Sequence, residues 1–165
     1  MIHRLLQRSE RLLGIEEAQA HCDIPCKIYD PIKAQLAALS VIRFMDLIAE
    51  VQNGHHGIAD QAQLIRLVQA KEQHAEEAKH EVRVIWGDYF KQPQFDRFPD
   101  ASKLVHEIML AGSACKQGIE RAKGDKLLAL VNQFAEMFWA SKDVATFTAI
   151  CPYLPSQPVV YPKLA

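Results

Sequence analysis

The chain has 165 residues, of which 49% are hydrophobic and 24% are charged, and its formal net charge is −1. This length supports one buried core and does not require two domains. The near-neutral charge, without a dense block of Lys and Arg, argues against a nucleic-acid-binding protein. No apolar run approaches the roughly 20 residues that cross a bilayer. We therefore expect a soluble domain that binds neither nucleic acid nor membrane.

The first segment, Met1 to Ala20, reads as a leader. It ends in Ala18-Gln19-Ala20, which a signal-peptidase-like enzyme could cut. Polar residues interrupt its leucines, so it lacks the continuous apolar segment of roughly 7–15 residues that a secretory signal contains. We expect a propeptide that a maturation peptidase removes by cutting between Ala20 and His21. The alternative is an amphipathic first helix that stays attached.

The next residues, His21-Cys22-Asp23-Ile24-Pro25-Cys26, concentrate metal donors. Pro25 disfavours a helical path and favours a tight turn that brings both sulfurs to one metal. Thiolates select soft or borderline metals, and a planar set of nitrogen and sulfur donors points to Ni(II) or Cu(II). In a cut chain, the His21 amine, the Cys22 amide nitrogen and the Cys22 sulfur can bind in sequence. Cys26 then closes the square, and the His21 imidazole can approach along the axis.

The rest of the chain predicts helices joined by short connections. Asp30-Pro31 is a helix-start signal, and Asn53-Gly54 stops the helix that follows. Asp100 caps a third helix, and Gly124-Asp125 separates the third from the fourth. The predicted helices cover residues 31–51, 59–90, 100–122 and 125–150, with a structured crossing at 91–99. Cys115 falls in an apolar stretch of the third helix and is expected to be a small core residue.

No stretch alternates convincingly enough to predict a sheet. Four prolines follow Cys151 and argue against a regular element in the tail: Pro152, Pro155, Pro158 and Pro162. We therefore expect an all-α fold, an antiparallel up-down four-helix bundle with a disordered or hook-like N-terminal segment. The predicted organisation is a propeptide (1–20), a hook and bundle domain (21–150) and a proline-rich tail (151–165).

Residues 21–26 and the Ile28-Tyr29-Asp30-Pro31 that follows closely resemble the amino-terminal hook of the nickel superoxide dismutase family. The long second helix carries further matches: Lys71-Glu72-Gln73, Ala78-Lys79-His80 and Trp86-Gly87-Asp88-Tyr89-Phe90-Lys91. Phe138-Trp139 resembles the family's last helix. The resemblance covers most of residues 21–142, and the hook is its most specific part.

This resemblance implies a four-helix bundle assembled as a homohexamer, with one nickel ion per hook. It implies disproportionation of superoxide to oxygen and hydrogen peroxide. The nickel ligands would be His21, through its amine and imidazole, Cys22, through its amide nitrogen and thiolate, and Cys26, through its thiolate. Tyr29 and Tyr89 match tyrosines that screen the open axial side and order water there. Asp23 matches a residue that helps to hold the hook.

The chain departs from the family pattern at three positions. The family usually has glycine where this chain has Lys27, an acidic residue where it has Ala37, and arginine where it has His74. The last two belong to the network that positions the axial imidazole, and such partners tune metal affinity and potential. We hypothesise that His74 takes over part of this role. Lys27 either adds positive potential that attracts a small anion or is a solvated turn lysine.

Other functions stay open on the sequence alone. Glu77-x-x-His80 has the spacing of a bundle-core di-iron site, although that architecture needs a second such pair. A bundle that holds nickel or copper without turnover, and a plain interaction bundle that keeps its leader, are further alternatives. A cytoplasmic location fits the weak leader and the reducing conditions that keep both hook thiols available.

Overall fold

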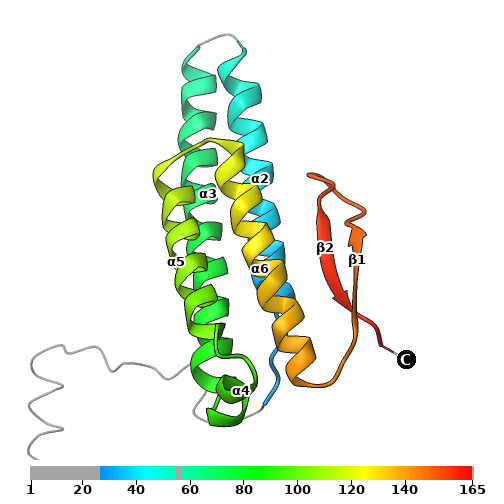
Figure 1. Ribbon diagram of the computed structural model, residues 1–165. Helices are drawn as coiled ribbons and strands as arrows, with labels where there is room; N and C mark the ends of the chain where they lie inside the picture. The colour runs from blue at the N-terminus through cyan, green and yellow to red at the C-terminus, as the bar shows by residue number, and fades with distance from the viewer. Residues whose placement is uncertain (1–26, 55–56, 165) are drawn as a thin grey trace, which may run out of the picture.

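A computed structural model describes residues 27–54 and 57–164 of the chain. Its body is an antiparallel bundle in which α2 packs against α3, α3 against α5, α5 against α6, and α6 against α2 (Figure 1). The bounds of these helices are α2 Ile32–Gln52, α3 Ile58–Val84, α5 Ala101–Gln117 and α6 Arg121–Ser141. The predicted four-helix bundle is confirmed.

Helix α2 begins where the sequence predicts. The carboxylate of Asp30 accepts a hydrogen bond from the backbone N–H of Ile32 at 2.8 Å, which satisfies a donor of the first turn. The buried side of α2 carries small and branched apolar residues: Ala34, Ala37, Ala38, Leu39, Val41, Ile42, Met45 and Ile48. Leu36 of the same helix lies away from this side and is 43% exposed.

The end of α3 differs from a regular helix. Residues Ile85–Tyr89 form a π turn, η1, in which the N–H of Phe90 bonds to the carbonyl of Ile85 at 3.3 Å. The sequence predicted one helix through residue 90, and it contained no signal for the change of pitch. A π turn inserts one residue relative to an α-helical path and therefore redirects the side chains at its end. Tyr89 is the last residue of this turn.

The crossing between α3 and α5 contains a short helix, α4 Gln92–Arg97, with Pro93 in its first turn. Helix α5 ends at Gln117 rather than near residue 122, and α6 already begins at Arg121. Gly124 was therefore wrongly predicted to end a helix. It lies inside α6, where an added Cβ would stand 2.9 Å from Cγ1 of Ile42 and 3.1 Å from Sδ of Met45. Glycine here permits close approach of α6 to α2.

The prediction that residues 142–150 continue the last helix and that the tail has no regular element is wrong. After α6 the chain forms an antiparallel hairpin of β1 Thr146–Ile150 and β2 Pro158–Pro162 (Figure 1). The ladder bonds flanking the strands join Lys163 to Ala145 and Cys151 to Gln157. By alternation, Pro158 and Pro162 occupy positions whose backbone nitrogen faces away from β1. The prolines therefore cost the ladder no hydrogen bond.

The outer edge of β2 is bonded to side chains of the bundle. Asn132 of α6 donates to the carbonyl of Pro158 at 2.9 Å and accepts from the N–H of Val160 at 3.3 Å. Gln35 of α2, which is 1% exposed, donates to the carbonyl of Val160 at 2.8 Å and to the side-chain oxygen of Asn132 at 3.0 Å. Two amide side chains thus take the place of a third strand and fix the hairpin against α2 and α6.

Cys115 is completely buried in the core, as predicted, and burial raises the pKa of its thiol to about 11. Within residues 27–54 and 57–164, no helix combines the length and apolar composition that a membrane crossing requires. The leader and its cleavage point lie outside the described residues.

Candidate functional site

The predicted ligands His21, Cys22 and Cys26, together with Asp23, lie outside the described residues. The structure begins at Lys27, directly after the proposed hook. Of the described residues, Lys27 to Tyr29 are nearest to the proposed hook in the sequence, and Tyr29 contacts Tyr89 at the end of the π turn, which in turn contacts the end of α6. The geometry of these contacts bears on the two tyrosines assigned by resemblance.

The structure brings Tyr29 and Tyr89 together. Their ring centroids are 5.8 Å apart and the planes are inclined by 51°. Tyr29 comes from the segment before α2, whereas Tyr89 ends the π turn after α3. Both side chains are half-buried. The family resemblance assigned both residues to one site, and their rings are in contact even though they are far apart along the chain.

Tyr89 is held on its other sides by residues near the end of α6. Its ring lies 5.0 Å from that of Phe138, centroid to centroid, and its hydroxyl lies 2.8 Å from the hydroxyl of Ser141. The Lys142 ammonium lies 4.6 Å from the Tyr89 ring centroid and 5.1 Å from that of Phe138. A cation over an aromatic face is attracted by the ring quadrupole. Sequence reasoning missed Ser141 and Lys142, because neither stands in a recognisable motif.

Lys27 adopts a left-handed backbone conformation, with φ of 59°. Residues other than glycine pay a steric cost there, since Cβ approaches the following carbonyl. This conformation gives a physical reason for glycine at the matching position in the family. The Lys27 side chain is exposed, and Lys27 lies in the same segment before α2 as Tyr29.

His74 of α3 is fixed by two neighbours rather than left in solvent. Its ring stacks on Phe44 of α2, with centroids 5.5 Å apart and an interplanar angle of 22°. Its Nδ1 lies 2.9 Å from a carboxylate oxygen of Glu77. Ala37, the other departure in the same proposed network, is 3% exposed within α2. A preoriented imidazole on α3 is compatible with the predicted positioning role, which stays a prediction.

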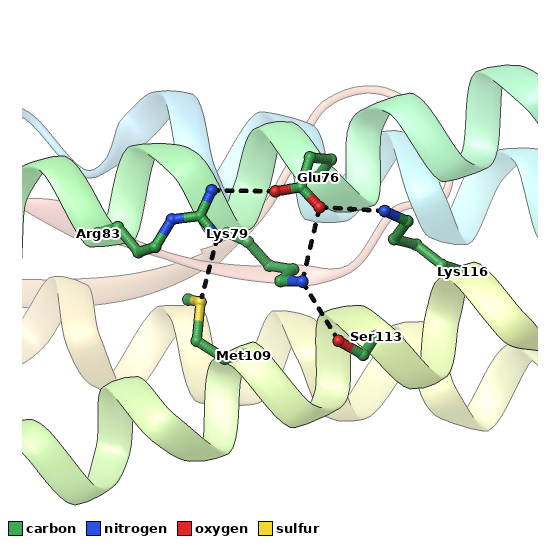
Figure 2. Close-up of polar contacts among 6 residues, drawn as sticks. All are labelled: Glu76, Lys79, Arg83, Met109, Ser113 and Lys116. Carbon is green, nitrogen blue, oxygen red and sulfur yellow. Dashed lines mark hydrogen bonds and ion pairs between the residues drawn. The ribbon is translucent and has the colours of Figure 1, made fainter. Parts of the chain in front are cut away.

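A charged cluster joins α3 to α5, as Figure 2 shows. The carboxylate of Glu76 receives Arg83 at 2.9 Å, Lys116 at 3.1 Å and Lys79 at 3.5 Å. Hydrogen bonds from Arg83 and Lys116 hold the pKa of Glu76 at about 2, well below its usual value. Lys79 also donates to the hydroxyl of Ser113 at 3.2 Å. Of these groups, Lys79, Ser113 and Lys116 line an open pocket of about 440 Å³, together with Glu72 and Gln117.

Lys71, the first residue of the family-like helix motif, has a structural role. It is 1% exposed, and its ammonium donates to the carbonyls of Cys115, Lys116 and Gly118 at 2.7, 3.1 and 2.6 Å. These carbonyls lie at the C-terminal end of α5. The last carbonyls of an α-helix have no backbone N–H of a following turn to accept from, so the Lys71 ammonium supplies the missing donor. Burial lowers the pKa of Lys71. A cation at a helix C-terminus also complements the helix dipole.

The described residues offer no competing metal site. Among residues 27–54 and 57–164, no group of three or more His, Cys, Asp or Glu side chains could hold a metal ion. The carboxylate of Glu77, in the Glu77-x-x-His80 motif, lies 2.9 Å from Nδ1 of His74. The donor types at residues 21–26 are two thiols, an imidazole and, if the Ala20–His21 bond is cut, an amine, and this set suits a soft-ligated redox metal.

Comparison with known proteins gives consistent matches. The family model for nickel-containing superoxide dismutase matches residues 16–142. The nickel superoxide dismutase of Streptomyces seoulensis is 39% identical over 126 residues, which cover 76% of this chain and 91% of the relative. That of Streptomyces coelicolor is 41% identical over 123 residues, 74% of this chain and 88% of the relative.

Solved structures agree with the sequence matches. A native nickel superoxide dismutase structure aligns with a TM-score of 0.65 and 39% identity, over 74% of this chain and 99% of that chain. A structure with nickel ligation corresponding to the oxidised state gives a TM-score of 0.66 over the same shares. The hairpin at residues 146–162 lies beyond the residues that the family model matches.

Proposed function

The chain belongs to the family of nickel-containing superoxide dismutases, and we propose that its hook, residues 21–26, forms the catalytic centre after the Ala20–His21 bond is cut. The protein is accordingly an oxidoreductase that acts on superoxide and uses nickel. The main structural support for the location of the centre is the 5.8 Å contact between Tyr29, close behind Cys26, and Tyr89.

The proposed ligands are His21, through amine and imidazole, Cys22, through amide nitrogen and thiolate, and Cys26, through thiolate. Asp23 helps to hold the turn of the hook. A nickel ion held by these donors would supply one-electron redox chemistry between its Ni(II) and Ni(III) states. The anionic sulfurs of Cys22 and Cys26 and the deprotonated Cys22 amide would stabilise the higher oxidation state of such an ion, so that it could act on superoxide both as reductant and as oxidant.

The chain's own residues manage access and protons. One superoxide gives up an electron and leaves as oxygen, and a second gains an electron and two protons and leaves as hydrogen peroxide. Tyr29 and Tyr89, whose rings are in contact, would limit access to the bound metal and order the water that delivers these protons. The positive charges of Lys27 and Lys142 add local attraction for a small anion.

Cleavage of the leader acts as the control step. While His21 stays in a peptide bond, its nitrogen is an amide rather than an amine, so the donor square is incomplete. A full-length Ala20→Pro chain that resists cutting should hold little nickel and lack dismutase activity. Intact mass spectrometry and nickel analysis of the protein from its native host test this; normal turnover by the uncut variant would refute it.

Assembly as a homohexamer in the cytoplasm is part of the same proposal. Exposed apolar side chains on α3 and α5 of the single chain support an assembly: Ile58 and Ile65 are 86% and 68% exposed, and Leu110 is 58% exposed. Such side chains are available for contacts between copies of the chain. Native mass spectrometry should give six copies, and a monomer at micromolar concentration would contradict it. The cytoplasm keeps the hook thiols reduced.

A further inference from the structure

We infer that Ser141 is a positioning residue for the Tyr89 hydroxyl, an inference that rests on the proposed function of Tyr89 in ordering water at the nickel centre. Ser141 is the last residue of α6. No resemblance or motif assigns it a role. The contact that carries the inference is the 2.8 Å hydrogen bond between the two hydroxyl groups.

The direction of this hydrogen bond follows from counting protons. The Ser141 hydroxyl lies 2.6 Å from the carbonyl oxygen of Phe138, which can only accept. A serine hydroxyl carries one proton, so this bond uses it. The Ser141 oxygen can then only accept from Tyr89. The hydroxyl of Tyr89 therefore donates its proton to Oγ of Ser141 at the end of α6.

The surroundings of Tyr89 keep the phenol in place for this bond. Its ring packs against Tyr29, Phe90 and Phe138, with centroids 5.8, 5.6 and 5.0 Å away. The ammonium of Lys142 lies over its face. Phe138, which supplies the final acceptor, is completely buried and so anchors the chain of bonds to the core. These contacts hold the phenol ring and the serine in place. The role of the Ser141 hydroxyl is therefore to set which of the two hydroxyl groups donates in their hydrogen bond.

This direction determines what Tyr89 offers to the site. Because its proton is used on Ser141, its oxygen presents only lone pairs elsewhere, and an ordered water there must donate to it. That water keeps its second proton for the reduced oxygen species. Without the Ser141 hydroxyl, the O–H of Tyr89 has no acceptor on α6 and can donate to the same water. The water then accepts from Tyr89 instead of donating to it, and its orientation changes.

The test uses the nickel-loaded chain beginning at His21. Ser141→Ala should lower kcat/KM roughly threefold, the scale expected for loss of one neutral hydrogen bond, while nickel content stays at one per chain. Ser141→Thr, which keeps the hydroxyl, should restore the wild-type value. In a Tyr89→Phe background, Ser141→Ala should add no further loss, since the partner hydroxyl is already absent. An equal loss in both backgrounds would mean that Ser141 matters only for the end of α6, and would overturn the inference.

A second readout is independent of turnover. In the full-length, metal-free chain labelled with carbon-13 at the tyrosine Cζ, the Tyr89 signal is assigned by Tyr89→Phe. Ser141→Ala should shift this signal and Ser141→Thr should leave it in place; an unshifted signal in Ser141→Ala would refute the hydrogen bond. Lack of dismutase activity in the unsubstituted nickel-loaded chain would instead overturn the proposed function, and the Cζ signal would still decide whether Ser141 holds Tyr89.

Discussion

The imidazole of His74 stacks on the ring of Phe44, with 5.5 Å between the centroids, while its Nδ1 lies 2.9 Å from Glu77. Helix α2 thus holds one face of the ring and α3 supplies a carboxylate at its edge. A histidine fixed in this way has a defined orientation, as a partner of another imidazole requires.

Replacing His74 by alanine should weaken the support of the axial His21 imidazole. We expect a changed axial-nitrogen signal in electron paramagnetic resonance of the oxidised protein and a turnover rate lower by about tenfold, within the range for lost partners of metal ligands. His106→Ala, at an exposed histidine of α5, is the control and should change neither. An unchanged signal and rate in His74→Ala would remove His74 from the account.

Lys27 combines a strained backbone with an exposed charge, and two substitutions separate the effects. Lys27→Gly should relieve the left-handed conformation at φ of 59° and raise the free energy of unfolding by less than about 1 kcal/mol, because greater freedom of the unfolded chain offsets part of the gain. Lys27→Gln keeps a side chain but removes the charge.

If the Lys27 charge attracts superoxide, both variants should show a weaker dependence of kcat/KM on salt than the wild type, since screening acts on charge alone. Stopped-flow assays between low and physiological ionic strength measure this. A salt dependence identical in all three proteins would identify Lys27 as a solvated turn residue.

Glu76 gives the bundle a pH-dependent contribution. Arg83 and Lys116 hold its pKa at about 2 in the folded chain, against 4.5 as the ordinary value. Because the pKa of Glu76 is lower in the folded chain than in the unfolded chain, its ionised carboxylate stabilises the fold at pH values above the ordinary pKa. That stabilisation is lost as the pH falls toward 2. Because 42% of the side chain is exposed, solvent screening limits the contribution to about 1 kcal/mol or less.

Chemical denaturation of Glu76→Gln should therefore show a stability deficit near neutral pH that shrinks below about pH 4.5. Glu136→Gln, at an exposed position of α6, serves as the control and should match the wild type throughout. A Glu76→Gln deficit of constant size from pH 7 to pH 3 would show that the ionised carboxylate is not its source.

Asn132 should decide whether the hairpin stays on the bundle. Asn132→Ala removes its bonds to Pro158, Val160 and Gln35 and leaves backbone groups of β2 unpaired, at a cost of roughly 1–3 kcal/mol. Hydrogen exchange at Val160 should accelerate while exchange in the core of α6 stays slow. Asn132→Asp retains the acceptor oxygens and should have a smaller effect; equal protection of Val160 in all three proteins would contradict the assignment.

The helices were predictable because their signals are local. Asp30-Pro31 starts α2 and Asn53-Gly54 follows its end, and neither depends on distant parts of the chain. The hairpin was not predictable from proline content, since the cost of Pro158 and Pro162 depends on the register with β1. Gly124 misled for a similar reason: its role is the approach of α6 to α2, not the end of a helix.

In the proposed site too, the features that depend on neighbouring residues could be predicted from the sequence, and those that depend on distant contacts could not. The donors at residues 21–26 stand together in the sequence, so their chemistry could be read directly. The pairing of Tyr29 with Tyr89 needed the resemblance, because the two residues come from different elements. Ser141 carried no signal at all, since its importance comes from one hydroxyl contact with a residue 52 positions earlier in the chain.

The most direct test of the N-terminal nickel hook compares two chains that differ by one residue, one beginning at His21 and one beginning at Ala20. Both are loaded with nickel and assayed for superoxide dismutation and for the axial-nitrogen signal of the oxidised metal. We predict one nickel per chain, rapid turnover and the signal only for the chain beginning at His21. Equal nickel binding and equal turnover by the chain that begins at Ala20 would show that the His21 amine is not a ligand.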